Sequence, residues 1–244
     1  MSDDRSGPPF LSLALPIAII IATLIGGWFF VKGKRGDQTI TVTGSAKKTI
    51  KSDRVSWKSA ISYQSTALAD AYKSLSEAVP RVKSYLVSKG IQENQITVSS
   101  ISSQTLHGRN SDGGETSEIT GYSLRQELEV TSTEVDKIAK IAREATELIN
   151  QGILIESMAP EYTYTQLGGL KIEMLAEAAK DAKTRADKIA ESTGSSIGSI
   201  RSARMGVLQI TPPGSTDVSD SGMYDTTSID KEITAVVNIG FAVD

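Results

Sequence analysis

A long uncharged segment near the start of the chain most constrains how this protein can fold. Residues 10–31 contain no charged side chain, and only Ser12 and Thr23 among them are clearly polar. As a helix this segment would be about 33 Å long, enough to cross the hydrocarbon core of a bilayer. We therefore predict a tail at residues 1–9, a transmembrane helix at 10–31 and a juxtamembrane linker at 32–38.

The residues that follow this segment favour a retained anchor over a cleaved signal peptide. A signal peptide has a shorter apolar core and ends at a cleavage site made of small residues. Here the apolar run is long, and the basic cluster Lys32 to Arg35 comes directly after it. We expect the segment to remain in the mature protein, with membrane lipid as its partner.

Small residues recur every four positions along the predicted anchor, at Ala14, Ala18, Ala22 and Gly26. This spacing places them on one side of a helix, and small side chains allow two helices to approach closely in lipid. The stripe is a candidate packing surface between anchors. The alternative is the ordinary abundance of small residues in membrane helices.

The charges beside the anchor bear on the side of the membrane that the domain occupies. Lys32, Lys34 and Arg35 outnumber Arg5, so the positive-inside rule alone favours a cytoplasmic domain. Long domains, however, translocate largely regardless of flanking charge. The rule therefore leaves the orientation open.

The remaining residues, 39–244, are predicted to form one α+β domain. Apolar residues alternate with polar ones where we expect strands, and recur three and four positions apart where we expect helices. Strands are expected at 39–44, 55–63, 96–105, 119–131, 153–165, 197–210 and 229–243. Helices are expected at 67–89, 134–149 and 170–192, and polar mobile loops at 108–117 and 212–227.

The order of these elements is repeated along the chain. Residues 53–131 and 153–243 each read as a β-α-β-β unit, and the helix at 134–149 links them. The strings Glu118-Ile119-Thr120 and Glu232-Ile233-Thr234 occupy matching places in the two units. We predict a duplicated fold whose units form an antiparallel sheet with helices on one face.

Several local strings resemble a known family. They are Lys89 to Thr97 (KGIQENQIT), Gly121-Tyr122 at the start of a strand, and the alanine-rich helix Glu177 to Ala190 that leads to Thr193-Gly194. Together they resemble the SIMPL-domain family (DUF541) of bacterial envelope proteins, over most of residues 38–244. The resemblance implies a location outside the cytoplasm, ring-like homo-oligomers and a loose link to envelope stress. It implies no catalytic residues.

The residues that usually carry chemistry are few. The chain has no cysteine and one histidine, His107, which excludes disulfides, thiolate metal sites and a thiol nucleophile. His107 lies beside Gly108 in a predicted mobile loop, where a base is difficult to hold in register for a catalytic triad. We predict a solvated histidine, no metal site and no cofactor.

Other candidate groups have simpler interpretations. Gly168-Gly169 lacks the Lys and Ser/Thr of a nucleotide loop and reads as a turn. Asp181, Asp187 and Glu191 lie among basic residues, as on a solvated helix face. The formal net charge is −3 and we find no basic stripe, so nucleic acid is not an expected partner.

These observations favour a non-enzymatic, self-associating scaffold in the bacterial inner membrane, single-pass, with a periplasmic domain. The final strand is apolar on both faces, and such strands are normally buried on both. Its residues Val236, Val237, Ile239 and Phe241 are therefore candidates for an interface between identical chains. Two alternatives stay open: a ligand-binding module that uses loops 108–117 and 212–227, and a hydrolase with an unrecognised carboxylate site.

Overall fold

The computed structural model describes residues 16–28 and 38–243. Residues 16–28 are helical, whereas 10–15 and 29–31 of the predicted anchor lie outside the described residues, as do the tail and most of the linker. Within these described ranges, no helix is long and apolar enough to cross a bilayer.

The α+β class is confirmed by the elements that follow. The strands are β1 (Thr39–Lys51), β2 (Arg54–Ser65), β3 (Ile96–Val98), β4 (Ser102–Arg109), β5 (Glu115–Ser132), β6 (Ile155–Ser157), β7 (Glu161–Thr163), β8 (Ile197–Met205), β9 (Gln209–Thr211), β10 (Met223–Tyr224) and β11 (Asp230–Val243). The helices are α2 (Leu68–Ser88), α3 (Val135–Glu144) and α4 (Leu167–Ser192), with 3₁₀ turns at Glu93–Gln95 and Ala145–Gln151.

The chain divides into two compact units that interleave in sequence. Unit 1 takes its described residues from 1–47, 171–208 and 234–244, and unit 2 consists of 48–170 and 209–233. Strands β1 and β11 each contribute residues to both units. The repeat expected at 53–131 and 153–243 is a different division of the chain and stays a prediction.

The strands form two sheets, so the expectation of one antiparallel sheet is wrong. The six-stranded sheet has the order β3-β5-β2-β6, with β4 also paired to β5 and β7 to β2. The five-stranded sheet has the order β1-β11-β9-β10, with β8 also paired to β11. One pair, β9 with β10, is parallel, which is possible because the loop 212–222 returns the chain before β10 begins.

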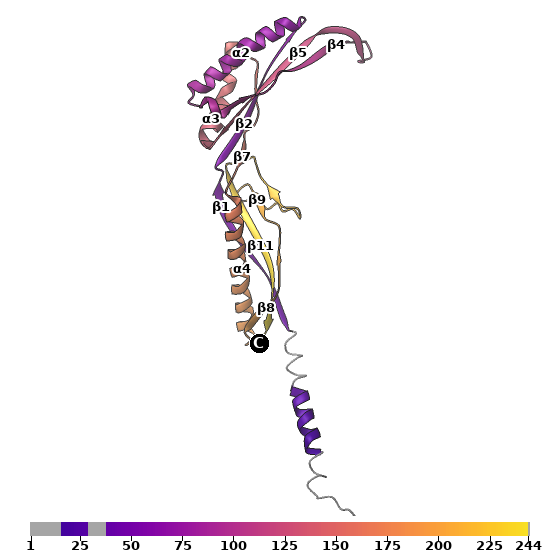
Figure 1. The fold of residues 1–244 in the computed structure, drawn as a ribbon, viewed down its shortest axis with the longest axis vertical. Helices are drawn as coiled ribbons and strands as arrows, with labels where there is room; N and C mark the ends of the chain where they lie inside the picture. The colour runs from indigo at the N-terminus through magenta and orange to yellow at the C-terminus, as the bar shows by residue number, and fades with distance from the viewer. Residues whose placement is uncertain (1–15, 29–37, 244) are drawn as a thin grey trace, which may run out of the picture. The chain divides into compact units, whose positions relative to one another are not determined.

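The core of unit 2 lies between the six-stranded sheet and helices α2 and α3, which cover one face of it (Figure 1). Val55, Trp57 and Ile61 of β2 are fully buried, as their alternation predicts. Helix α2 contributes Leu75, Val82 and Leu86, also fully buried; the remaining buried residues of its inner face are alanines.

Helix α2 confirms the predicted helix at 67–89, and it runs through Pro80 without a break. It ends at Gly90, whose φ of 84° lies in the left-handed region, where glycine is favoured. The Ile91 N–H donates to the Leu86 carbonyl at 3.1 Å, and Ile91 is buried. Gly90 and the buried Ile91 therefore terminate the helix with a hydrophobic contact.

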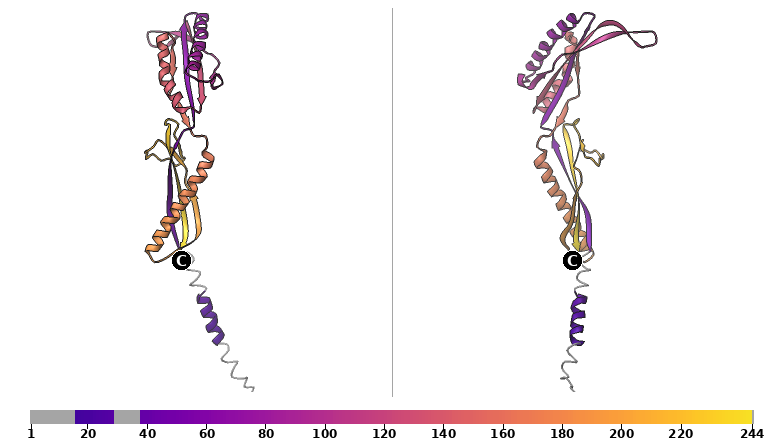
Figure 2. Two further views of the ribbon diagram at one scale, coloured as in Figure 1. Left: turned by 90° about the vertical axis from the view of Figure 1, so that its left-hand side faces the viewer. Right: turned by 45° about the vertical axis from the view of Figure 1, so that its right-hand side comes forward.

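Unit 1 packs helix α4 against its sheet, along β1 and β11 (Figure 2). The buried side of α4 carries a stripe of small residues, Ala178, Ala182, Ala186 and Ala190, which follows the larger buried side chains of Leu170 and Met174. The contact is so close that a Cβ placed on Gly44 of β1 would lie 2.2 Å from the Ala178 carbonyl oxygen. Glycine at this position is therefore what allows the helix and strand to approach.

Half of the predicted mobile loop 108–117 is strand. Strands β4 and β5 continue as a hairpin until a turn at 110–114, where the Asn110 N–H donates to the Gly114 carbonyl at 2.9 Å. The Gly114 N–H in turn donates to Asn110 Oδ1 at 2.7 Å. Residues 102–120 form an arm, hereafter the β4–β5 arm, that extends beyond the helices (Figure 1).

Four of the predicted elements are shorter or divided. The strand expected at 96–105 is β3 and the start of β4, separated at 99–101. The strand expected at 153–165 is two strands, β6 and β7, which flank Pro160, a residue that has no N–H to donate. The strand expected at 197–210 is β8 and β9, separated at 206–208. The helix expected at 134–149 ends as α3 at Glu144 and continues as a 3₁₀ turn.

Candidate functional site

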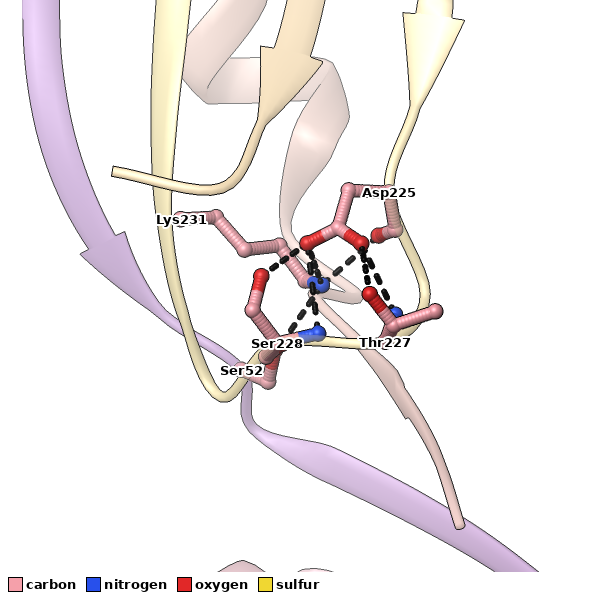
Figure 3. Close-up of polar contacts among 5 residues, drawn as sticks. All are labelled: Ser52, Asp225, Thr227, Ser228 and Lys231. Atoms are coloured by element: carbon pink, nitrogen blue, oxygen red, sulfur yellow. Dashed lines mark hydrogen bonds and ion pairs between the residues drawn. The ribbon is translucent and has the colours of Figure 1, made fainter. Parts of the chain in front are cut away.

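Within the described residues, Lys231 and Asp225 form an ion pair whose side chains are both buried inside unit 2 (Figure 3). Lys231 lies at the start of β11, and Asp225 directly follows β10. The lysine side chain has no exposed surface and the aspartate side chain is 6% exposed. Since a buried charge is strongly disfavoured unless it is paired, this cluster is the first candidate for a functional site.

The lysine uses all of its donors. The Lys231 ammonium donates to the Asp225 backbone carbonyl at 2.6 Å, to the Ser228 carbonyl at 2.7 Å and to Asp225 Oδ2 at 3.1 Å. An ammonium group has three N–H bonds, so no donor remains for a substrate.

The Asp225 carboxylate is equally occupied. Its Oδ1 accepts from the Thr227 N–H at 2.8 Å and from the Thr227 hydroxyl at 2.7 Å. Its Oδ2 accepts from the Ser228 hydroxyl and N–H as well as from Lys231. Burial raises the pKa of Asp225, but the hydrogen bonds from Ser228, Thr227 and Lys231 outweigh burial and hold the pKa well below its usual range.

The segment 225–231 connects several strands of unit 2. The Ser52 N–H at the end of β1 donates to the Ile229 carbonyl at 2.9 Å, and the Tyr162 N–H of β7 donates to the Thr226 carbonyl at 2.7 Å. The Asp225 N–H donates to the Ile210 carbonyl of β9 at 2.9 Å. We call residues 225–231 the buried clamp, because they hold three strands through satisfied hydrogen bonds.

The clamp has the chemistry of a structural element. A general base needs a free acceptor and a nucleophile needs a free, accessible atom. Neither exists at Lys231 or Asp225, whose polar atoms are hydrogen-bonded and excluded from solvent. The arrangement therefore stabilises the charged forms of both residues and offers no reacting group.

Sequence reasoning did not identify the clamp, although a signal was present. Lys231 shares the strand parity of Ile229 and Ile233, which are apolar residues of the predicted strand 229–243. A lysine on such a face has to be paired when it is buried. The nearby Asp225 had been assigned to the polar loop 212–227, which concealed the pairing.

The predicted stripe of the anchor lies partly within the described residues. Ala18, Ala22 and Gly26 belong to the helical residues 16–28 and are exposed, and Ala14 lies outside the described part of the chain. A packing role for this stripe stays a prediction.

The four predicted interface residues have different surroundings. Val237, Ile239 and Phe241 are 7%, 5% and 3% exposed, so the chain itself covers them. Val236 is half-buried and faces the opposite side of β11. A contact between identical chains at these residues stays a prediction, and only Val236 keeps side-chain surface for it.

The other candidate residues do not converge on a site. His107 is exposed on β4, opposite Ile119 of β5. Gly168 and Gly169 lie within the first turn of α4, not in a turn before it. Trp57 and Tyr162 belong to the core, as expected.

The acidic residues of α4 serve the helix and its contact with the sheet. Asp181 accepts from the Ser45 N–H of β1 at 2.8 Å and from Arg185 at 2.9 Å. The Ser45 hydrogen bond, followed by that of Arg185, lowers the pKa of Asp181. Glu191 pairs with Lys188 on the surface. In the described part of the chain, no three His, Cys, Asp or Glu residues gather as a metal site would require.

Two hollows of about 390 Å³ each occur on the described surface. One lies in unit 2, at the start of α3, and includes Lys51, Thr133 and Lys137. The other lies in unit 1, on the sheet, and includes Thr41, Arg204 and Asn238. Neither is lined by residues of loops 108–117 or 212–227, the loops of the alternative hypothesis of a ligand-binding module.

A family model matches most of the chain. The model of the SIMPL family, described as a protein of unknown function (DUF541), matches residues 40–241. No curated protein matches the chain.

Proposed function

The chain belongs to the SIMPL (DUF541) family, and from this premise we propose that it is a membrane-anchored, self-associating scaffold of the bacterial envelope with no catalytic activity. The uncharged residues 10–31 support the anchor, and the domain is proposed to lie in the periplasm. The saturated hydrogen bonds of the buried clamp support a structural role for the most conspicuous polar cluster.

The observation that carries self-association is the β4–β5 arm. Strand β4 pairs only with β5 among the described strands, and residues 102–120 are exposed apart from Leu106, Gly108 and Thr116, which are half-buried. A two-stranded hairpin on its own is marginally stable in water. An arm of this length is therefore better explained if a neighbouring molecule contacts it.

The charges of the arm favour a second copy of the chain as that neighbour. Strand β4 carries Arg109 near the turn, whereas β5 carries Glu115 and Glu118. Ile119, which is 54% exposed, directly follows Glu118 on β5 and lies opposite His107 of β4. A surface with both signs and an apolar residue is self-complementary, as contacts between identical subunits require.

Light scattering on the full-length protein in detergent tests the proposal. The mass should exceed that of one 26.0 kDa chain and increase with concentration. Ile119→Lys should shift the mass towards one chain, because it places a charge in the apolar centre of the contact. Ile172→Lys on α4 is the matched control, since Ile172 is even more exposed (73%) but lies outside the arm.

A single chain at every concentration would overturn self-association, and an Ile119→Lys variant that assembles like its parent would exclude the arm as the contact. The anchor has its own test, which is mass spectrometry of the membrane fraction. A mature N-terminus beyond about residue 33 would show that the predicted anchor is removed.

The orientation is tested by a reporter fused after residue 244 that is active only in the periplasm. Its activity is expected, because a periplasmic domain is proposed. Activity of a cytoplasmic reporter in its place would reverse the orientation without affecting the anchor.

A further inference from the structure

Strand β8 in unit 1 has an edge that no described strand covers. It pairs with β11 alone, and every residue from 199 to 207 is exposed. The edge has no proline, and the strand carries Arg201 and Arg204 but no acidic residue. An open edge presents unpaired backbone N–H and C=O groups, which form a template for another strand.

The register identifies the backbone groups that are free. The Gly206 N–H donates to the Val236 carbonyl at 2.9 Å, and Arg204 lies directly opposite Asn238. In an antiparallel pair, every second residue turns its N–H and C=O towards the partner strand. Residues 202, 204 and 206 therefore face β11, and the backbone groups of Ala203 and Met205 point to the open edge.

Beside this edge lies the hollow of unit 1, on the face of the sheet opposite α4. Gly44 of β1 faces α4, so its sequence neighbours Thr41 and Thr43 fall on the other face. A Cβ on Gly240 would lie 2.7 Å from the Ser202 hydroxyl and 3.5 Å from that of Thr41. Because Gly240 has no side chain, the space between these two hydroxyl groups stays open.

The polar groups of this hollow can hold a carboxylate. The Arg204 guanidinium forms no hydrogen bond or ion pair with the residues that the structure describes, and Arg204 lies on this face opposite Asn238. The Asn238 Oδ1 is used by the Thr43 hydroxyl at 3.0 Å, which leaves the amide N–H groups free to donate. A guanidinium beside hydroxyl and amide donors matches the oxygen atoms of a carboxylate.

We propose that the open edge of β8 binds an extended acidic peptide segment of another protein as an added strand, with one of its carboxylates on Arg204 in the hollow. Main-chain hydrogen bonds to Ala203 and Met205 supply affinity, and alternate side chains supply specificity. The Arg204 guanidinium favours an acidic partner by charge complementarity. This site goes beyond the scaffold role and is independent of the β4–β5 arm.

The test is fluorescence anisotropy with the full-length protein in detergent and a labelled eight-residue peptide in which Glu alternates with Val. A peptide in which Lys replaces Glu is the control ligand. The Glu peptide should bind in a saturable manner and the Lys peptide should not. Arg204→Gln should weaken binding about tenfold, the loss expected for one charge-assisted contact.

Ala203→Pro separates an added strand from a carboxylate site alone. Proline removes an N–H on the open edge, which an edge strand tolerates, and leaves the bonds to β11 intact. It should weaken binding of the Glu peptide at least tenfold, with circular dichroism unchanged. Met205→Pro removes the other outward N–H and serves as a second variant where Ala203→Pro perturbs the fold.

The remaining outcomes overturn the proposal. Equal binding of the Glu and Lys peptides, or no binding of either, excludes an acidic partner. A loss in Arg204→Gln without a loss in either proline variant shows a carboxylate site with no added strand. A lower mass of Ala203→Pro in light scattering, without peptide, shows that the edge joins copies of this chain.

Discussion

Unit 2 and unit 1 each pack helices on a sheet, but the side chains at the helix–sheet contact differ in size. Helix α2 buries Leu75, Val82 and Leu86 beside two alanines, whereas α4, beyond Leu170 and Met174, buries four alanines that lie along β1 at Gly44. Large side chains remove more apolar area from water, at roughly 25 cal/mol per Å². Unit 2 is therefore stabilised more by the burial of large apolar side chains. Unit 1 is stabilised more by the close packing of the α4 and β1 backbones.

The two units also differ in their ion pairs. The Lys231–Asp225 pair of unit 2 is buried, whereas Lys188 and Glu191 of unit 1 are 74% and 72% exposed. Exposed ion pairs contribute little to the free energy of unfolding, because water and salt screen them. A buried charge without its partner, in contrast, strongly destabilises the folded state. The predictions below test these two contrasts, beginning with the largest effect.

Lys231→Met should lower the free energy of unfolding by about 3–5 kcal/mol, because it leaves the Asp225 carboxylate buried without its cation. Denaturant unfolding followed by circular dichroism measures the change. Lys188→Met is the matched control, and its unfolding midpoint should equal that of the parent. A Lys231→Met variant as stable as the control would show that the clamp contributes little.

Leu75→Ala should lower the free energy of unfolding by about 2–5 kcal/mol, since Leu75 is fully buried and its removal leaves a cavity in unit 2. Val87→Ala on the same helix is the control, because Val87 is 39% exposed and should lose much less. The same denaturant series gives both values. Equal losses at the two positions would mean that the core of unit 2 relaxes around the cavity.

Gly44→Ala tests the opposite sensitivity in unit 1. The added Cβ would lie 2.2 Å from the Ala178 carbonyl oxygen and 2.4 Å from the Ala182 nitrogen, both backbone atoms of α4. Helix and strand must separate, at a cost of roughly 1–3 kcal/mol. Gly168→Ala is the control, because nothing lies near its Cβ position and alanine favours a helix by roughly 0.5–1 kcal/mol. If Gly44→Ala leaves the free energy of unfolding unchanged, the contact between α4 and β1 does not depend on glycine at this position.

The sequence predicted the fold best where one periodicity dominates. The period of two in β2 and the apolar spacing in α2 identified Trp57, Ile61 and Leu75 as core residues, and the structure buries them. These patterns are local, because each face is decided by residues two to four positions apart. The α+β class followed from them.

The grouping of strands into sheets and units was beyond such reasoning. The pairing of β9 with β10 and the division of the chain at residues 47–48 and 208–209 depend on contacts between distant segments. The β4–β5 arm was missed because its residues are polar on both faces, so no alternation marks them as strands. The clamp was missed because its two charged residues were assigned to different elements.

The two units should also differ in how far acid lowers their stability. Near neutral pH this is the smallest of the predicted effects. The pKa of Asp225 is lowered in the folded state by Ser228, Thr227 and Lys231, against the opposing effect of its burial, and that of Asp181 by Ser45 and Arg185. A carboxyl group with a depressed folded pKa stabilises the protein above its unfolded pKa, about 3.9 for aspartate. That stability is lost as the pH falls through this value towards the folded pKa.

The slope of the unfolding free energy between pH 6 and pH 3 measures this loss. Asp225→Asn should flatten the slope more than Asp181→Asn, because the Asp225 side chain is 6% exposed and that of Asp181 is 32% exposed. Salt should reduce the contribution of Asp181 further, since exposed interactions are screened, and leave that of Asp225 nearly unchanged. Parallel curves for the parent and Asp225→Asn would show that Asp225 titrates alike in both states. The buried clamp would then not be the acid-sensitive element of unit 2.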